Sequence, residues 1–180
     1  IEGGCLTYKD NELVRKIYNL RNFGIRNEEL VEDIGINGKM NEIQAAVGLL
    51  NLKLYKSEQE KRKELKAYYD SQLKKVEGIR VLEMPKGVTN SYQYYPIVIE
   101  DAYPETRDEL YTRLRDKDIY ARKYFYPACS DYEPYKTLPS SSVENLPVTN
   151  EYKNRVLCLP FYGTLEEEHR EKICREIIKC

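Results

Sequence analysis

The feature that most constrains the fold is a long helical pattern, at residues 41–75, whose character changes along its length. Its first third is apolar, with Ile43 and Leu50 on one helical face. The segment 56–64 is almost wholly charged or polar, and apolar spacing returns from Leu65 onward. A helix that is polar all round in its middle usually crosses solvent between packed bodies. The sequence therefore predicts that the start of this helix packs on one domain and its end on another.

A side-chain signal marks the start of this helix. Asn41 is a favourable N-cap, and Gln44 three residues later completes a capping-box-like pair. The preceding residues, 26–40, are polar and contain glycine, which is typical of a loop. A long loop held by a rigid scaffold often contacts ligands, so we expect Asn37 and Lys39 to be available for binding.

Strand and helix patterns alternate after this helix. Their order, strand–strand–helix–strand followed by further helix, indicates a small α/β sandwich with helices on one face of a mixed or antiparallel sheet. Pro96 has no N–H to donate, so its strand is expected at a sheet edge or with a bulge. Thr164 and Glu167 predict a capping box before the last helix. The strands expected after the long helix are 79–82, 92–99, 119–125 and 158–161, and one further strand is expected before it, at 3–8. The expected later helices are 104–117, 150–157 and the segment after 164.

Composition excludes several classes of protein. The net charge of −1 argues against a nucleic-acid-binding protein that neutralises phosphates. No apolar run approaches the roughly 20 residues that span a bilayer, so no membrane segment is expected. The five cysteines are odd in number and lack C-x-x-C spacing, and there is one histidine. This pattern argues against a metal site or a disulfide framework and favours reduced thiols in a cytoplasmic protein.

Five segments, in order along the chain, resemble the sugar aminotransferases of the DegT/DnrJ/EryC1/StrS family. They are IEGG at 1–4, LRNFGI at 20–25, the loop and helix start at 35–54, YFYP at 124–127 and VLCLPF at 156–161. The resemblance implies a pyridoxal-phosphate enzyme of the aspartate-aminotransferase fold, which transfers an amino group, with glutamate as donor, to a nucleotide-linked keto-deoxysugar for polysaccharide or glycan synthesis.

The resemblance also implies a division of the chain within that α/β fold. Residues 1–40 would be the tail of the large cofactor-binding domain with a dimer-crossing loop, 41–75 a connecting helix, and 76–180 the small C-terminal α/β domain. In the family the E-G-G turn follows the lysine that forms the Schiff base with the cofactor. Since the chain starts at Ile1, that lysine is expected upstream, and the chain alone is expected to be inactive.

Three residues take site roles from the resemblance. Asn37 matches an asparagine that binds the cofactor phosphate of the neighbouring subunit in a homodimer with shared active sites. Lys39 falls where many members carry arginine, and it is expected to contact substrate as a point charge. Tyr124 falls where some members carry a histidine that meets substrate, on a loop that closes over the nucleotide sugar.

Two alternatives remain open from the residues. The chain could be a non-catalytic interaction domain whose tyrosines and long helix serve assembly. It could also belong to a relative that uses the same fold for sugar dehydration, with histidine in place of the lysine. The residue a few places before Ile1 would separate these alternatives.

Overall fold

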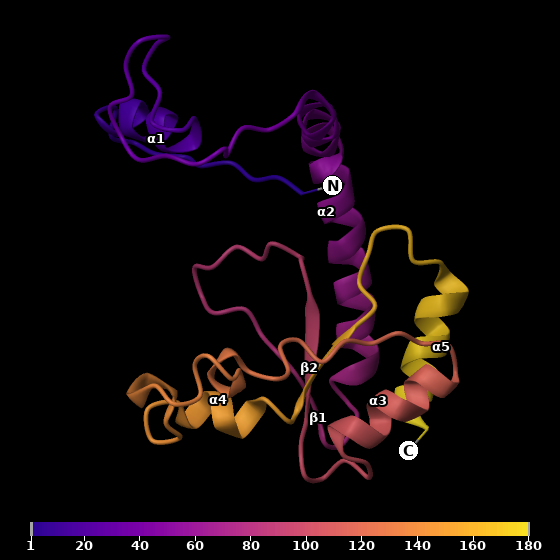
Figure 1. Cartoon of the computed structure of the whole chain (residues 1–180). Coiled ribbons are helices and arrows are strands. Elements are labelled where there is room, and N and C mark those ends of the chain that lie inside the picture. Colours follow the sequence, from indigo (N-terminus) through magenta and orange to yellow (C-terminus); the bar gives the residue numbers. More distant parts are fainter. Residues whose placement is uncertain (1, 180) are drawn as a thin grey trace. The chain divides into compact units, whose positions relative to one another are not determined.

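The structure is a computed structural model that describes residues 2–179. The chain divides into two compact units, Ile1–Lys56 and Ser57–Cys180, and the boundary falls within its longest helix. Each unit is described by itself below (Figure 1). The first residue of the IEGG segment and Cys180 lie outside the described residues.

The first unit contains one short helix, a loop and the start of the long helix. Helix α1 (Leu13–Arg21) ends at a turn in which Gly24 has a φ of +74°. A Cβ at this position would lie 1.6 Å from the carbonyl oxygen of Asp33, so only glycine fits. The prediction of a strand at 3–8 is wrong. This segment is exposed, and among the described residues no strand lies beside it to share backbone hydrogen bonds.

Helix α2 (Glu42–Leu73) has the predicted start and a mixed environment. The capping box is confirmed: the Gln44 amide N–H donates to Asn41 Oδ1 at 2.8 Å, and the Asn41 N–H donates to Gln44 Oε1 at 3.0 Å. Leu73, at the end of the helix, is fully buried within the second unit. Ile43, at its start, is 70% exposed. The predicted packing of the second end is therefore confirmed, whereas apolar residues at the first end face solvent.

The second unit is built on a three-stranded antiparallel sheet in the order β1-β2-β3, namely β1 (Ile79–Val81), β2 (Tyr95–Ile99) and β3 (Val156–Leu159). The predicted edge position of Pro96 is wrong, since β2 is the central strand. Val81 pairs with Ile97, which follows Pro96 in the chain, and the ladder with β1 ends at this pair. Pro96 therefore breaks no hydrogen bond with β1.

The longer helices of this unit cover one face of the sheet, as expected, whereas one short helix lies on the other side. Helix α3 (Arg107–Asp116) and helix α5 (Glu167–Ile178) pack beside the end of α2, and Figure 1 shows α4 (Pro147–Tyr152) with its preceding loop on the other side of the strands. This loop contains two 3₁₀ turns, η1 (Cys129–Asp131) and η2 (Pro139–Ser141). The buried core includes Ile97, Leu110, Leu157 and Ile177.

Three element predictions in this unit need correction. The segment 119–125 is not a strand, since its pairing with β3 is limited to a single bridge between Arg122 and Cys158. The helix expected at 150–157 is α4, which begins earlier and ends at Tyr152 so that the chain can enter β3. Thr164 does not cap α5, since it lies in a turn closed by the Leu165 N–H on the Tyr162 carbonyl, and Glu166 is the N-cap. Within the described residues, no helix has the length and apolar content to cross a membrane.

Candidate functional site

The loop before α2 presents Asn37 and Lys39 at the surface of the first unit. Asn37 forms an isolated antiparallel bridge with Asn22 at the end of α1. The neighbouring backbone is tied to the same helix, with the Ile36 N–H on the Leu20 carbonyl and the Gly38 N–H on the Arg21 carbonyl, each at 2.8 Å. The loop is therefore held against the end of α1 by backbone hydrogen bonds on both sides of Asn37.

The two side chains that this loop presents are suited to an anion. Asn37 and Lys39 are both exposed on this loop. The Lys39 ammonium donates to Asn22 Oδ1 at 3.0 Å and lies 4.7 Å from the centre of the Phe23 ring. An ammonium has three N–H donors, so donors remain for an anionic substrate. The Asn37 amide, whose N–H groups can donate to a phosphate oxygen, fits the phosphate of the cofactor that the resemblance implies.

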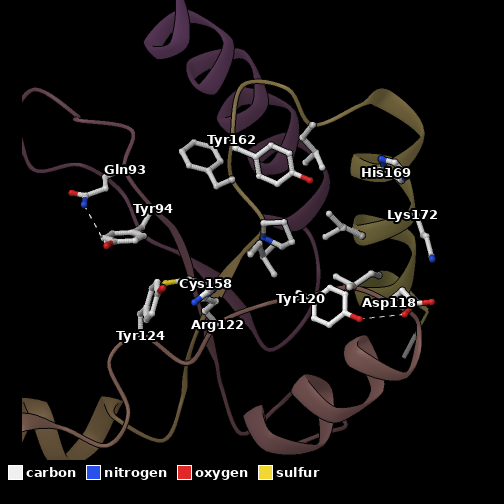
Figure 2. Close-up of a pocket in the computed structure, with 16 residues that line it drawn as sticks. Gln93, Tyr94, Asp118, Tyr120, Arg122, Tyr124, Cys158, Tyr162, His169 and Lys172 are labelled. Carbon is white, nitrogen blue, oxygen red and sulfur yellow. Dashed lines mark hydrogen bonds between the residues drawn. The ribbon is translucent and has the colours of Figure 1, made fainter. Parts of the chain in front are cut away.

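The second unit contains a cavity of about 560 Å³ between the ends of β2 and β3 and helix α5. Figure 2 shows Tyr94, Arg122 and Tyr124 together near Cys158, with His169 and Lys172 on α5 at the opposite side of the group. Its volume lies in the range of small-molecule sites, which bury most of a ligand among aromatic and apolar side chains. The cavity therefore has the size and composition of a binding site.

Tyr124, the residue predicted to meet substrate, lies in an aromatic group at this cavity. Its ring stacks on Phe125 with centroids 4.8 Å apart and meets the Tyr94 ring edge-on at 5.3 Å. The Arg122 guanidinium carbon lies 5.6 Å from the Tyr124 centroid, a cation–π distance. Tyr124 thus lines the cavity, whereas Asn37 and Lys39 belong to the other unit.

The charges at the cavity favour an anionic ligand. Arg122 and Lys172 are the cations, and Lys172 is held by its hydrogen bond to the Lys117 carbonyl at 2.7 Å. Asp118 is the carboxylate among the lining residues. Burial raises the pKa of the Cys158 thiol to about 11, so this side chain stays neutral and forms part of the cavity lining. The described residues contain no group of three or more His, Cys, Asp or Glu placed to hold a metal ion.

Sequence reasoning missed most of this cavity. His169 is exposed among charged neighbours, and it also lines the cavity. Tyr94 and Lys172 are far apart in sequence, and only the sheet and α5 bring them to one place. The one local signal was Arg122, a cation two residues before Tyr124.

Comparison with known proteins defines the class to which the chain belongs. Residues 1–178 match the DegT/DnrJ/EryC1/StrS aminotransferase family, and the chain belongs to this family. It is 41% identical over 177 residues to dTDP-4-amino-4,6-dideoxy-D-glucose transaminase from Escherichia coli, covering 98% of this chain and 48% of the relative. The transaminase of the same name from Shigella dysenteriae is 36% identical, with 98% and 47% covered. The chain spans about half the length of the curated relatives it matches.

A solved structure supports the predicted fold. The crystal structure of DesI in the presence of its TDP-sugar product superposes with a TM-score of 0.84 at 28% identity, covering 95% of this chain and 43% of that protein. The expectation of an α/β chain that forms the C-terminal part of the aspartate-aminotransferase-like fold is confirmed.

Proposed function

We propose that this chain is the C-terminal portion of a pyridoxal-phosphate-dependent aminotransferase that acts on a nucleotide-linked keto-deoxysugar. The observation that carries the proposal is the 41% identity, across 98% of the chain, to a transaminase of a dTDP-linked amino sugar. The amino donor is glutamate, and the enzyme works as a cytoplasmic homodimer with shared active sites. The product serves polysaccharide or glycan synthesis.

Within this enzyme the chain has three parts. Residues 1–40 form the tail of the large domain with the loop that reaches the neighbouring subunit, 41–75 the connecting helix, and 76–180 the small domain. When bound, pyridoxal phosphate supplies an electron sink that lets an amino group pass between donor and acceptor. Asn37 donates its amide N–H to the phosphate, and Lys39 contributes a positive charge to the anionic substrate. The lysine that binds the cofactor covalently belongs to the part of the enzyme that precedes this chain.

The small domain binds the substrate through the cavity at Tyr124. Aromatic rings such as Tyr94 and Tyr124 offer flat faces to a sugar or base, with polar tips for its hydroxyl groups. Arg122 and Lys172 neutralise the diphosphate of a nucleotide sugar. The chain thus orients the substrate and shields it from water, while the large domain performs the chemistry.

The test is an assay of the full-length protein with glutamate and a nucleotide-linked keto-deoxysugar, in which release of 2-oxoglutarate is followed. We expect release that requires the sugar nucleotide, and none from the 180-residue chain alone. Tyr124→Ala should raise the KM for the sugar nucleotide, whereas Tyr132→Ala, a matched change outside the cavity lining, should not. Absence of sugar-dependent release from the full-length protein would overturn the proposal and leave the dehydratase or assembly readings.

A further inference from the structure

The first turn of α3 contains a buried arginine that the proposed function does not use. The Arg107 side chain is 1% exposed. Its Nη1 donates to the carbonyls of Lys153 and Val156, each at 3.2 Å, and its Nε donates to Asp108 at 2.7 Å. Nη2 is buried without a hydrogen-bond partner among the described residues. Arg107 therefore ties the start of α3 to the entry of β3.

The same helix turn also holds the chain on both sides of Tyr124. After Tyr124, the ring of Tyr126 lies over the Arg107 guanidinium, with 4.8 Å between the guanidinium carbon and the ring centre. Before Tyr124, the Lys123 ammonium lies 2.5 Å from the Asp108 carboxylate. The two residues that flank the pair Tyr124–Phe125 are thus fastened to two consecutive residues of α3.

A third contact holds the continuation of this loop. Lys153, whose carbonyl accepts from Arg107, pairs through its ammonium with the Asp131 carboxylate at 2.8 Å. Asp131 in turn accepts from the N–H of the buried Ala128 at 3.2 Å. Three of the contacts that hold residues 123–131 therefore converge on Arg107 and its immediate neighbours.

We propose that Arg107 is a positioning residue, which sets the place of Tyr124 at the cavity through its contact with Tyr126. This inference rests on the proposed function insofar as it concerns the sugar nucleotide. Stability alone does not require an arginine here, because a buried guanidinium with an unused donor is costly and an apolar side chain of similar volume is often as stable. Position does require it, since a methionine could not bind the two carbonyls, and its thioether would offer the Tyr126 ring no cationic contact.

The loss of this contact has a defined consequence for binding. If the loop leaves its binding-competent position for nine-tenths of the time, the apparent affinity for the sugar nucleotide falls about tenfold. The amino donor does not meet Tyr124 in this account, so its KM should change less than about twofold. A general loss of folding would lower the amount of active protein without separating the two KM values.

The experiment uses the full-length protein with Arg107→Met, Arg107→Lys, Tyr126→Ala and Tyr126→Phe. The matched control is Arg113→Met, because Arg113 lies on the same helix but pairs with Glu105 and the Glu176 carbonyl, away from the loop. KM is measured for each substrate, sugar-nucleotide binding is measured by calorimetry, and amide hydrogen exchange is followed at residues 123–131.

We expect Arg107→Met and Tyr126→Ala to weaken sugar-nucleotide binding about tenfold and to speed exchange in the loop. Tyr126→Phe should match the wild type because the ring face remains, and Arg107→Lys should recover part of the loss. Wild-type binding and exchange in both Arg107→Met and Tyr126→Ala, or equal effects in Arg113→Met, would overturn the proposal. Tyr126→Ala decides alone if Arg107→Met does not fold. Calorimetry and exchange need no turnover, so they test Arg107 even if the wild type proves not to be a transaminase.

Discussion

Replacing Leu73 with alanine tests whether the end of α2 is part of the core of the second unit. Leu73 is fully buried, and it packs with the sheet and with α3 and α5. Leu52 lies in the same helix but is 75% exposed. The two substitutions remove the same atoms from the same kind of element, so their difference reports the environment alone.

The size of the effect follows from the burial. Leu→Ala removes three carbon groups, worth ~0.8 kcal/mol each when buried, and the cavity left behind adds to this loss. Leu73→Ala should therefore lower the free energy of unfolding by about 3–4 kcal/mol, or the Tm by about 10 °C for a chain of this size. Leu52→Ala should stay within about 0.5 kcal/mol of the wild type, because it loses little burial and alanine favours a helix.

The assay is urea unfolding of the 180-residue chain at low protein concentration, followed by far-ultraviolet circular dichroism. The midpoint shift, at an unchanged slope, gives the change in the free energy of unfolding. A cost below about 1 kcal/mol for Leu73→Ala, or an equal cost for Leu52→Ala, would refute the assignment of the end of α2 to this core.

Three further predictions concern caps, pH and assembly. Thr106→Ala should cost about 1 kcal/mol in the same assay, because its hydroxyl caps α3 in a box with Glu109, and no loss would contradict that role. The hydrogen bond from Lys123 lowers the pKa of Asp108, so this pair stabilises the fold at neutral pH and the contribution disappears as pH falls below about 4. Asp108→Asn should therefore make Tm fall less steeply as the pH is lowered. An unchanged dependence of Tm on acid pH would contradict a stabilising role for the Lys123–Asp108 pair. The apolar start of α2 is exposed, so the chain should self-associate; sedimentation that shows only monomer at high concentration would contradict this.

The features that could be predicted from the sequence were those set by neighbouring residues. Asn41 with Gln44 forms the expected capping box, and Thr106 with Glu109 forms another, because each pair lies within one helical turn. The same spacing at Thr164 failed, since a tight turn already uses that backbone. A capping pattern therefore predicts a cap only where the backbone before the helix is not already held in another turn.

The features that could not be predicted depend on distant parts of the chain. Leu13 and Leu20 have helical spacing, yet both are exposed, because a buried face needs a partner that the pattern does not supply. Tyr124 was placed by a short motif, whereas Tyr94 reaches the same cavity only through the pairing of β2. In the sequence Arg107 is one more charge at a helix start, and only the fold buries it under Tyr126.

The proposed role of Asn37 is to donate its amide N–H, from the loop before α2, to a cofactor phosphate in the neighbouring subunit. The most direct test mixes two inactive full-length proteins, one with Asn37→Ala and one with the cofactor-binding lysine replaced by alanine, after dissociation and reassociation. If the sites are shared, each mixed dimer contains one intact site, and about a quarter of the wild-type activity should return. If Asn37 acts within its own subunit, no mixed dimer contains an intact site and activity will stay at the level of the separate variants.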